Sequence, residues 1–232
     1  MRKLLIGTAV LAVLLVVLVA ADRISVAVAE NQISDRLTSA YGLPDKPGVS
    51  ISGFPFLTQV AAGDYRQIDV SASQVQADGA TLRDLNVRLS GVHASVSQVL
   101  GGGSSMVTAD HAAGSAVIGF GVVDQRLPGG LRLRPAGRDL SVSGRLAYHG
   151  VQIPLSATVA LGVSGSGISV TPVKVRVPGA VGLPLPTAAS SRLRVMVPLS
   201  TLPLHLRLES VHVTHGGLRI GASARDVQFA RT

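Results

Sequence analysis

Two histidines near the carboxyl end are the first candidates for chemistry, because imidazole is a common metal ligand and acid–base catalyst. His212 and His215 are three residues apart in or beside an expected strand. Successive side chains of a strand point to opposite faces, so this spacing separates the two rings. A shared metal ion would require the turn to reorient His215, and we therefore predict no metal site.

Other catalytic motifs are also missing from the sequence. The segment "GVSGSG" at 162–167 departs from the G-x-S-x-G spacing of a nucleophile elbow, and the chain has no cysteine. Its 13 carboxylates are scattered singly, without a pair spaced for acid–base work. The glycine-rich "LGGGSSM" at 100–106 lacks the lysine that follows in a phosphate-binding loop. We predict a non-catalytic protein without a cofactor.

The amino terminus carries an export signal. Arg2 and Lys3 precede an uncharged run from Leu4 to Ala21, close to the roughly 20 residues that cross about 30 Å of hydrocarbon. Two interpretations fit residues 1–22: a signal anchor, or a signal peptide cleaved after Ala21. In both, the positive charges stay inside and residues 23–232 form one domain at the extracytoplasmic face of the plasma membrane, anchored there or secreted.

The composition limits the kinds of partner that the exported chain is expected to bind. Without cysteine, no disulfide holds the exported fold, so apolar burial and sheet hydrogen bonds must stabilise it. The net charge of +8 favours anionic lipid headgroups or acidic glycans as partners, whereas the absence of tryptophan argues against a single-stranded nucleic acid. The alternative is that the basic residues only solvate the outer face of a sheet. We predict that the chain contacts a membrane and does not bind nucleic acid.

The segment after the signal has the period of a helix. In "DRISVAVAENQISDRLTSAYG" the apolar residues recur at steps of three and four, and Gly42 and Pro44 provide a stop. These apolar residues are Val26, Ala29, Ile33, Leu37 and Ala40. The pattern predicts an amphipathic helix that continues directly from the apolar run.

From Val49 onward the period changes to two, which predicts antiparallel strands. Residues 67–90 form a hairpin around "QADGAT", and "VTHGGLRIGASARDVQF" supplies the final turn and last strand. The strand at 151–163 is so long that it must bend or twist. At Thr171-Pro172, and again at Ser210, the apolar residues change from even to odd positions along the strand. Such a change would turn them to the other face of the sheet, so we predict a β-bulge at each place.

These segments, in their order, resemble a known family. "GFPFLTQVAAGDYRQIDVSA", "SGRLAYHGVQIPLSATVAL" and "MVPLSTLPLHLRLESVHVTHGGLRI" are similar to segments of the LmeA-like phospholipid-binding proteins of the actinobacterial cell envelope. The resemblance implies a TULIP-like fold of the α+β class, mainly β. In that fold a strongly curved antiparallel sheet wraps around the amino-terminal helix and encloses an elongated apolar groove.

The resemblance also implies a function. It implies non-catalytic binding of phospholipid, with transfer of the lipid as an option. It also implies support of lipid or lipoglycan assembly, including lipomannan, with envelope glycosyltransferases as partners. The alternative is a scaffolding protein of the envelope whose sheet has a solid core and no lipid cavity.

The predicted lipid site centres on "GFPFLTQ". Gly53 lets the backbone turn and Pro55 ends ladder hydrogen bonding, so Phe54 and Phe56 lie at a strand end. There the two rings line the mouth of a groove or, alternatively, plug the open end of the sheet against the helix. The predicted groove residues are Ile33, Leu37, Phe54, Phe56, Leu57, Leu204 and Leu206.

A second predicted site is a basic surface for anionic lipid. Lys174 and Arg176 alternate with valines, and Arg192 and Arg194 alternate with Leu193 and Val195. Alternation along a strand places all four charges on the face opposite the apolar one. Each basic group near an anionic bilayer contributes about 1 kcal/mol of attraction.

Overall fold

The computed structural model describes most of the chain. The described residues are 2–77, 80–94, 107–125, 127, 130–136, 139–148, 151–164, 167–176, 195–198 and 207–229. The chain divides into two compact units. Unit 1 comprises residues 1–72, 87–112 and 225–232, and unit 2 comprises 73–86 and 113–224. The single domain expected from residue 23 onward stays a prediction.

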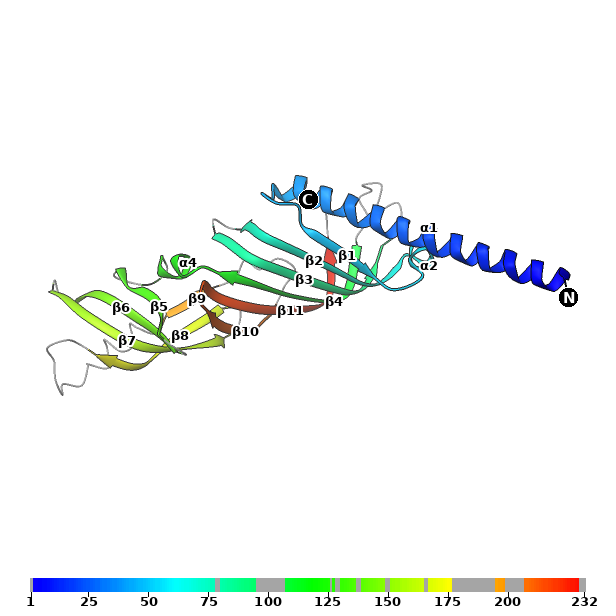
Figure 1. The fold of residues 1–232 in the computed structure, drawn as a ribbon. Helices are drawn as coiled ribbons and strands as arrows, with labels where there is room; N and C mark the ends of the chain where they lie inside the picture. The colour runs from blue at the N-terminus through cyan, green and yellow to red at the C-terminus, as the bar shows by residue number, and fades with distance from the viewer. Residues whose placement is uncertain are drawn as a thin grey trace. The chain divides into compact units, whose positions relative to one another are not determined.

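Strands make up most of the fold (Figure 1). The elements are α1 (Arg2–Tyr41), β1 (Gly48–Ser52), α2 (Phe56–Ala62), β2 (Asp64–Ala77), β3 (Ala80–His93), β4 (Val107–Ile118), α4 (Phe120–Asp124), β5 (Arg132–Ala136), β6 (Asp139–Tyr148), β7 (Val151–Ser164), β8 (Gly167–Arg176), β9 (Val195–Pro198), β10 (Arg207–Thr214) and β11 (Gly217–Phe229). A long amino-terminal helix followed by antiparallel strands confirms the predicted α+β, mainly β class. The curvature and the groove stay predictions.

The strands form two sheets, and their register explains the parity shifts seen in the sequence. The six-stranded sheet has the order β1-β2-β3-β4-β11-β10, and the five-stranded sheet runs from β5 to β9 in chain order. Between β7 and β8 the register passes from Lys174 to Pro172 and skips Val173. Between β10 and β11 it skips Glu209. Both predicted bulges are therefore confirmed. Ile168 and Val170 precede the first bulge and Leu208 precedes the second, and all three are buried.

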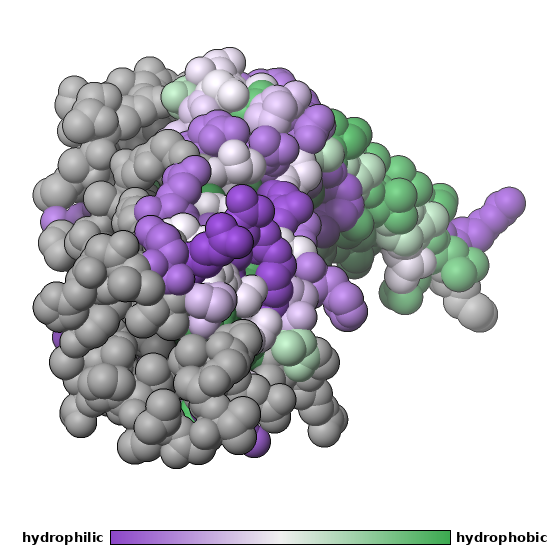
Figure 2. Space-filling model, turned by 90° about the vertical axis from the view of Figure 1, so that its left-hand side faces the viewer, coloured by the Kyte–Doolittle hydropathy of each residue, from purple (hydrophilic) through white to green (hydrophobic). Residues whose placement is uncertain are grey.

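Helix α1 is continuous through the apolar run and the amphipathic segment. Val26 and Ala29 are buried in the interior of unit 1. Ile33 and Leu37 are partly buried, and Ala40 is exposed. Every described side chain from residue 2 to 21 is exposed, and Figure 1 shows this half of α1 extending past the strands of unit 1. Figure 2 shows it as a largely hydrophobic surface. Among the described helices α1 alone is long and apolar enough to cross a membrane, a property that signal sequences share.

The sequence pattern does not predict α2 and α4, because each is too short to show a helical period. For α2 a weaker signal exists. Pro55 lies at its amino terminus and Gly63, in the left-handed conformation, lies at its carboxyl terminus, an asymmetry typical of helices. The strand-end expectation at Phe54 and Phe56 holds for β1, but Phe56 begins α2.

Each unit has its own apolar interior. The buried cluster of unit 1 consists of Val26, Ala29, Ile51, Phe56, Tyr65, Val92, Ala94 and Ala109. In unit 2, side chains of both sheets and of α4 meet in a cluster that contains only alanine, valine, leucine and isoleucine among its buried members. Its most deeply buried side chains are Leu131, Leu133, Leu140, Ile168, Leu218, Val123 and Val170.

Candidate functional site

The structure separates the two phenylalanines of "GFPFLTQ". Phe56 is 4% exposed and lies in the unit 1 cluster, with its ring centroid 6.3 Å from that of Tyr65. Phe54 is 55% exposed, and the guanidinium carbon of Arg23 lies 5.1 Å from its ring centroid. Phe56 is therefore a core residue of unit 1, whereas Phe54 is exposed. The choice between a groove mouth and a plug stays open.

The other predicted groove residues do not all gather at this place. Ile33 packs against the same cluster as Phe56, and Leu37 is partly buried on the same helix. Leu57 is 42% exposed. Leu204 and Leu206 lie outside the described residues. A groove lined by the seven predicted residues accordingly stays a prediction.

A buried carboxylate holds α2 against α1. Asp22 is 3% exposed, and its Oδ1 accepts a hydrogen bond of 2.8 Å from the backbone N–H of Leu57. Its Oδ2 accepts one of 2.8 Å from Arg23 Nη2. Burial acts to raise the pKa of Asp22, but the hydrogen bonds from Leu57 and Arg23 and the arginine charge outweigh it and lower the pKa below the ordinary value. Asp22 thus stays ionised while it fixes the start of α2.

The loop before α2 closes over a buried amide. Gly53 has φ of +114°, and a Cβ at this position would lie 2.7 Å from Gln59 Nε2. The other amide atom, Oε1, accepts a hydrogen bond of 2.9 Å from the backbone N–H of Arg66. Gln59 Nε2 has no hydrogen-bond partner among the described residues. The positive φ at residue 53 favours glycine over residues with a side chain, which explains the first letter of the motif.

The predicted basic surface is only partly described. Lys174 is exposed in β8 and pairs with Thr158, while the neighbouring Val173 is exposed too because it is the bulged residue. Arg176 pairs with Ser156 along the backbone. The side chain of Arg176, together with Arg192 and Arg194, lies outside the described residues, so the four-residue docking surface stays a prediction.

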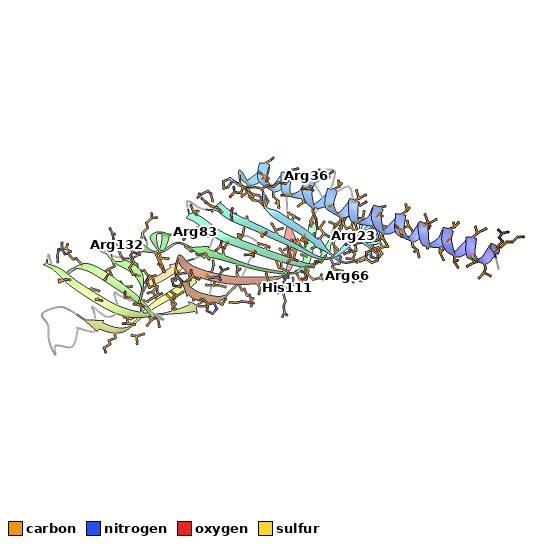
Figure 3. The ribbon with its side chains drawn as sticks, viewed as in Figure 1. Arg23, Arg36, Arg66, Arg83, His111 and Arg132 are labelled. Carbon is orange, nitrogen blue, oxygen red and sulfur yellow. The ribbon has the colours of Figure 1, made fainter. Side chains whose placement is uncertain are left out.

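Arginines elsewhere on the chain were not predicted as a site. Figure 3 shows Arg23 on α1 and Arg66 on β2 at the α2 end of unit 1. Both residues are exposed. The available signal was the position of Arg23, which follows the apolar run after a single residue, where basic side chains commonly reach lipid headgroups.

The interior of unit 2 is entirely apolar among its buried members. Its buried cluster is aliphatic, and further apolar side chains at its margin are partly exposed. These marginal residues are Leu82, Leu85, Phe120, Val122, Leu161, Val211 and Val213. The interior therefore resembles lipid hydrocarbon in composition, and headgroup contacts would have to come from outside the cluster.

Comparison with known proteins now identifies the family. A family model for LmeA-like phospholipid-binding proteins matches residues 20–223. The chain belongs to this family. Comparison of this chain with curated proteins and with solved structures found no match. The match covers nearly all of this LmeA-like chain except the apolar run, which agrees with the resemblance expected from the sequence.

A polar cluster of this LmeA-like chain consists of His93, Asp64 and Asp110. His93 Nδ1 lies 2.5 Å from Asp64 Oδ1, and Nε2 lies 3.2 Å from Asp110 Oδ1. All three side chains are about half exposed or more, and they join β2, β3 and β4 at one end. Among the described residues no group of three or more such side chains is arranged to hold a metal ion. The cluster joins the strand ends through contacts between exposed side chains, which contribute little to stability.

Proposed function

We propose that this chain binds phospholipid, without catalysing a reaction on it, at the extracytoplasmic face of the plasma membrane in the cell envelope. The bound lipid is then available for transfer and for lipid or lipoglycan assembly by envelope glycosyltransferases. The observation that carries the proposal is the match to a phospholipid-binding family over residues 20–223.

In this proposal the acyl chains enter the aliphatic interior of unit 2, between its two sheets. An acyl chain is worth roughly 0.8 kcal/mol per CH₂ when it leaves water, but a bilayer lipid is already in hydrocarbon. The exchange is therefore close to neutral in free energy, and headgroup contacts and shape set the selectivity.

The proposal also includes a retained membrane anchor. Helix α1 runs without interruption through Ala21 and Asp22, the two sides of the alternative cleavage point. Cleavage there would leave Asp22, whose carboxylate is buried against α2, as a charged amino terminus. This geometry favours the anchor over the cleaved form. The intact mass of the purified mature chain tests it: loss of residues 1–21 would contradict retention.

Photo-crosslinking tests where lipid binds. The full chain is reconstituted into vesicles that contain a phospholipid with a diazirine in its acyl chain, irradiated and mapped by peptide mass spectrometry. Any membrane helix gives adducts on residues 4–21. We expect additional adducts on β7 and β10, near Leu161 and Val211, because these side chains border the unit 2 interior.

A matched pair of variants on β10 controls this experiment. Val211→Glu places a charge at the margin of the interior, whereas His212→Glu places it on an exposed neighbour. We expect the first variant to lose the unit 2 adducts and the second to keep them, with circular dichroism showing that both fold. Equal labelling of the two variants would contradict binding at this margin.

A scaffolding protein with a solid core is the second candidate. The observation that favours it is the near-complete burial of the seven central side chains of unit 2, since a well-packed core has little empty space. Adducts confined to α1, with none on unit 2, would support this candidate and overturn lipid binding.

A further inference from the structure

The α2 end of unit 1 carries two exposed apolar side chains beside an arginine. Phe54 and Leu57 are 55% and 42% exposed, and Arg23 lies over the Phe54 ring. We call these three residues the interface patch. Large apolar side chains with this exposure are ordinary when scattered, but a group of them next to a basic residue indicates a binding surface.

The position of the interface patch along α1 follows from a hydrogen bond. The backbone N–H of Leu57 donates to Asp22 Oδ1 at 2.8 Å, so the first turn of α2 lies beside the first residue after the apolar run. At 1.5 Å per residue the run from Leu4 to Ala21 is about 27 Å long, close to the hydrocarbon thickness of about 30 Å. When α1 spans a bilayer, the patch is therefore level with the boundary between hydrocarbon and headgroups.

The chemistry of the interface patch matches that boundary. Aromatic rings and arginine are favoured where one side of a residue meets hydrocarbon and the other meets phosphate. Arg23 uses Nη2 to bind Asp22, yet its side chain is about half exposed and a guanidinium has further N–H donors for a lipid phosphate. Apolar exposure continues on the opposite side of α1 at Ile24 and Val28.

We propose that Phe54 and Leu57 insert into the interface of the bilayer that α1 spans, with Arg23 bound to lipid phosphate. The proposal rests on the retained anchor described above. A single spanning helix leaves a domain free to rotate and tilt. A second contact at the side of the helix fixes the face that unit 1 presents to the membrane, through the Asp22 to Leu57 bond that joins α2 to α1.

The chain contains no tryptophan, so a single introduced tryptophan reports on one position. The full chain with Phe54→Trp is reconstituted into phosphatidylcholine vesicles brominated on the acyl carbons nearest the headgroup. We expect a blue-shifted emission that loses most of its intensity in brominated vesicles and resists aqueous iodide.

Tyr41→Trp is the matched control. Tyr41 is also aromatic, is 68% exposed and lies on the same helix, about 30 Å beyond Ala21 at 1.5 Å per residue. We expect its tryptophan to be quenched by iodide and unaffected by bromine. Leu57→Trp provides a second probe of the patch in case Phe54→Trp disturbs the loop, and it is expected to behave like Phe54→Trp.

The outcomes separate the interface patch from lipid binding by unit 2. Iodide quenching at 54 and 57 equal to that at 41 would overturn the patch, while photo-adducts on β7 and β10 would still support lipid binding. Bromine quenching at 54 without those adducts would support the patch alone. Protection from iodide without bromine quenching would mean that protein covers the patch, which also contradicts insertion.

Discussion

The interiors of the two units are built from different side chains. In unit 1 the buried residues include the aromatics Phe56 and Tyr65 and the polar residues Asp22, Ser34 and Gln59. The buried cluster of unit 2 contains aliphatic residues only. Hydrogen bonds and ring contacts have preferred directions, whereas aliphatic contacts depend mainly on volume.

This difference suggests a division of roles. Asp22 and Ser34 bond α1 to backbone atoms of Leu57 and Pro47, which sets the rotation and axial position of the helix in unit 1. The aliphatic interior of unit 2 imposes no such direction, and it is there that the proposed function places the acyl chains. Four tests, ordered from the largest expected effect to the smallest, examine this contrast.

Gly217→Ala tests whether the backbone of unit 2 is sterically constrained even though its aliphatic side-chain contacts have no preferred direction. Gly217 has φ of +156°, and a Cβ there would overlap the backbone carbonyl of Ile118. We expect the substitution to lower the free energy of unfolding by about 4 kcal/mol or more, since strain and overpacking add. Gly216→Ala is the control, because its Cβ would meet only the flexible Arg83 side chain at 3.4 Å. Denaturant unfolding of the full chain in detergent measures both, and equal losses would refute the backbone clash.

Phe56→Ala and Phe54→Ala test the plug in unit 1. Removal of the buried Phe56 ring leaves a cavity, and we expect a loss of about 3 kcal/mol or more in the free energy of unfolding. Removal of the exposed Phe54 ring should cost less than about 1 kcal/mol. Thermal melts of the two variants decide the matter. A large loss for Phe54→Ala would show that this ring is also part of the core.

Ser34→Ala tests the directional contacts of unit 1. The buried Ser34 hydroxyl donates to the backbone carbonyl of Pro47. Without it the carbonyl loses its donor, so we expect a loss of about 1–2 kcal/mol. Ser39→Ala on the same helix is the control, because its hydroxyl is exposed and bonds within the helix, and we expect almost no change. Similar unfolding midpoints for the two variants would weaken the contrast between the units.

The pH dependence of stability tests the hydrogen bond between Asp22 and the backbone of Leu57. Its expected effect is the smallest of the four. The pKa of Asp22 lies below its ordinary value of 3.8 when the chain is folded. A carboxyl of this kind stabilises the fold fully above the unfolded value, and its contribution disappears as the pH falls through the folded value. Asp22→Asn keeps an oxygen acceptor for Leu57 but cannot ionise. We therefore expect the variant and the parent to differ in unfolding midpoint at neutral pH and to converge below about pH 4. A constant difference would refute the charge contribution.

Much of the fold could be predicted from the sequence. The period of three and four located the buried stripe of α1 at Val26 and Ala29, and Gly42 marked its end. Parity shifts placed the bulges beside Pro172 and Ser210. These features depend on the order of side chains along one element, so a pattern of periods is sufficient to find them.

The candidate site could be predicted only in part. The sequence singles out the motif "GFPFLTQ" but gives no reason to separate its two phenylalanines. The two rings differ in burial because α2 begins at Phe56, whose ring lies in the unit 1 cluster, whereas Phe54 lies in the preceding loop and is exposed. A seven-residue helix is too short for its period to show.

The sequence by itself determined the apolar amino-terminal run, the helix that continues from it, the alternation of the strands and the family, because each depends on local order and composition. Only the tertiary structure decided that Asp22 is buried, that it bonds the backbone of Leu57, and that Phe54 and Leu57 lie level with the end of the apolar run. The physical reason is that a hydrogen bond between residues 35 positions apart leaves no periodic trace in the chain. It exists only once strand β1 has carried the backbone back to the helix.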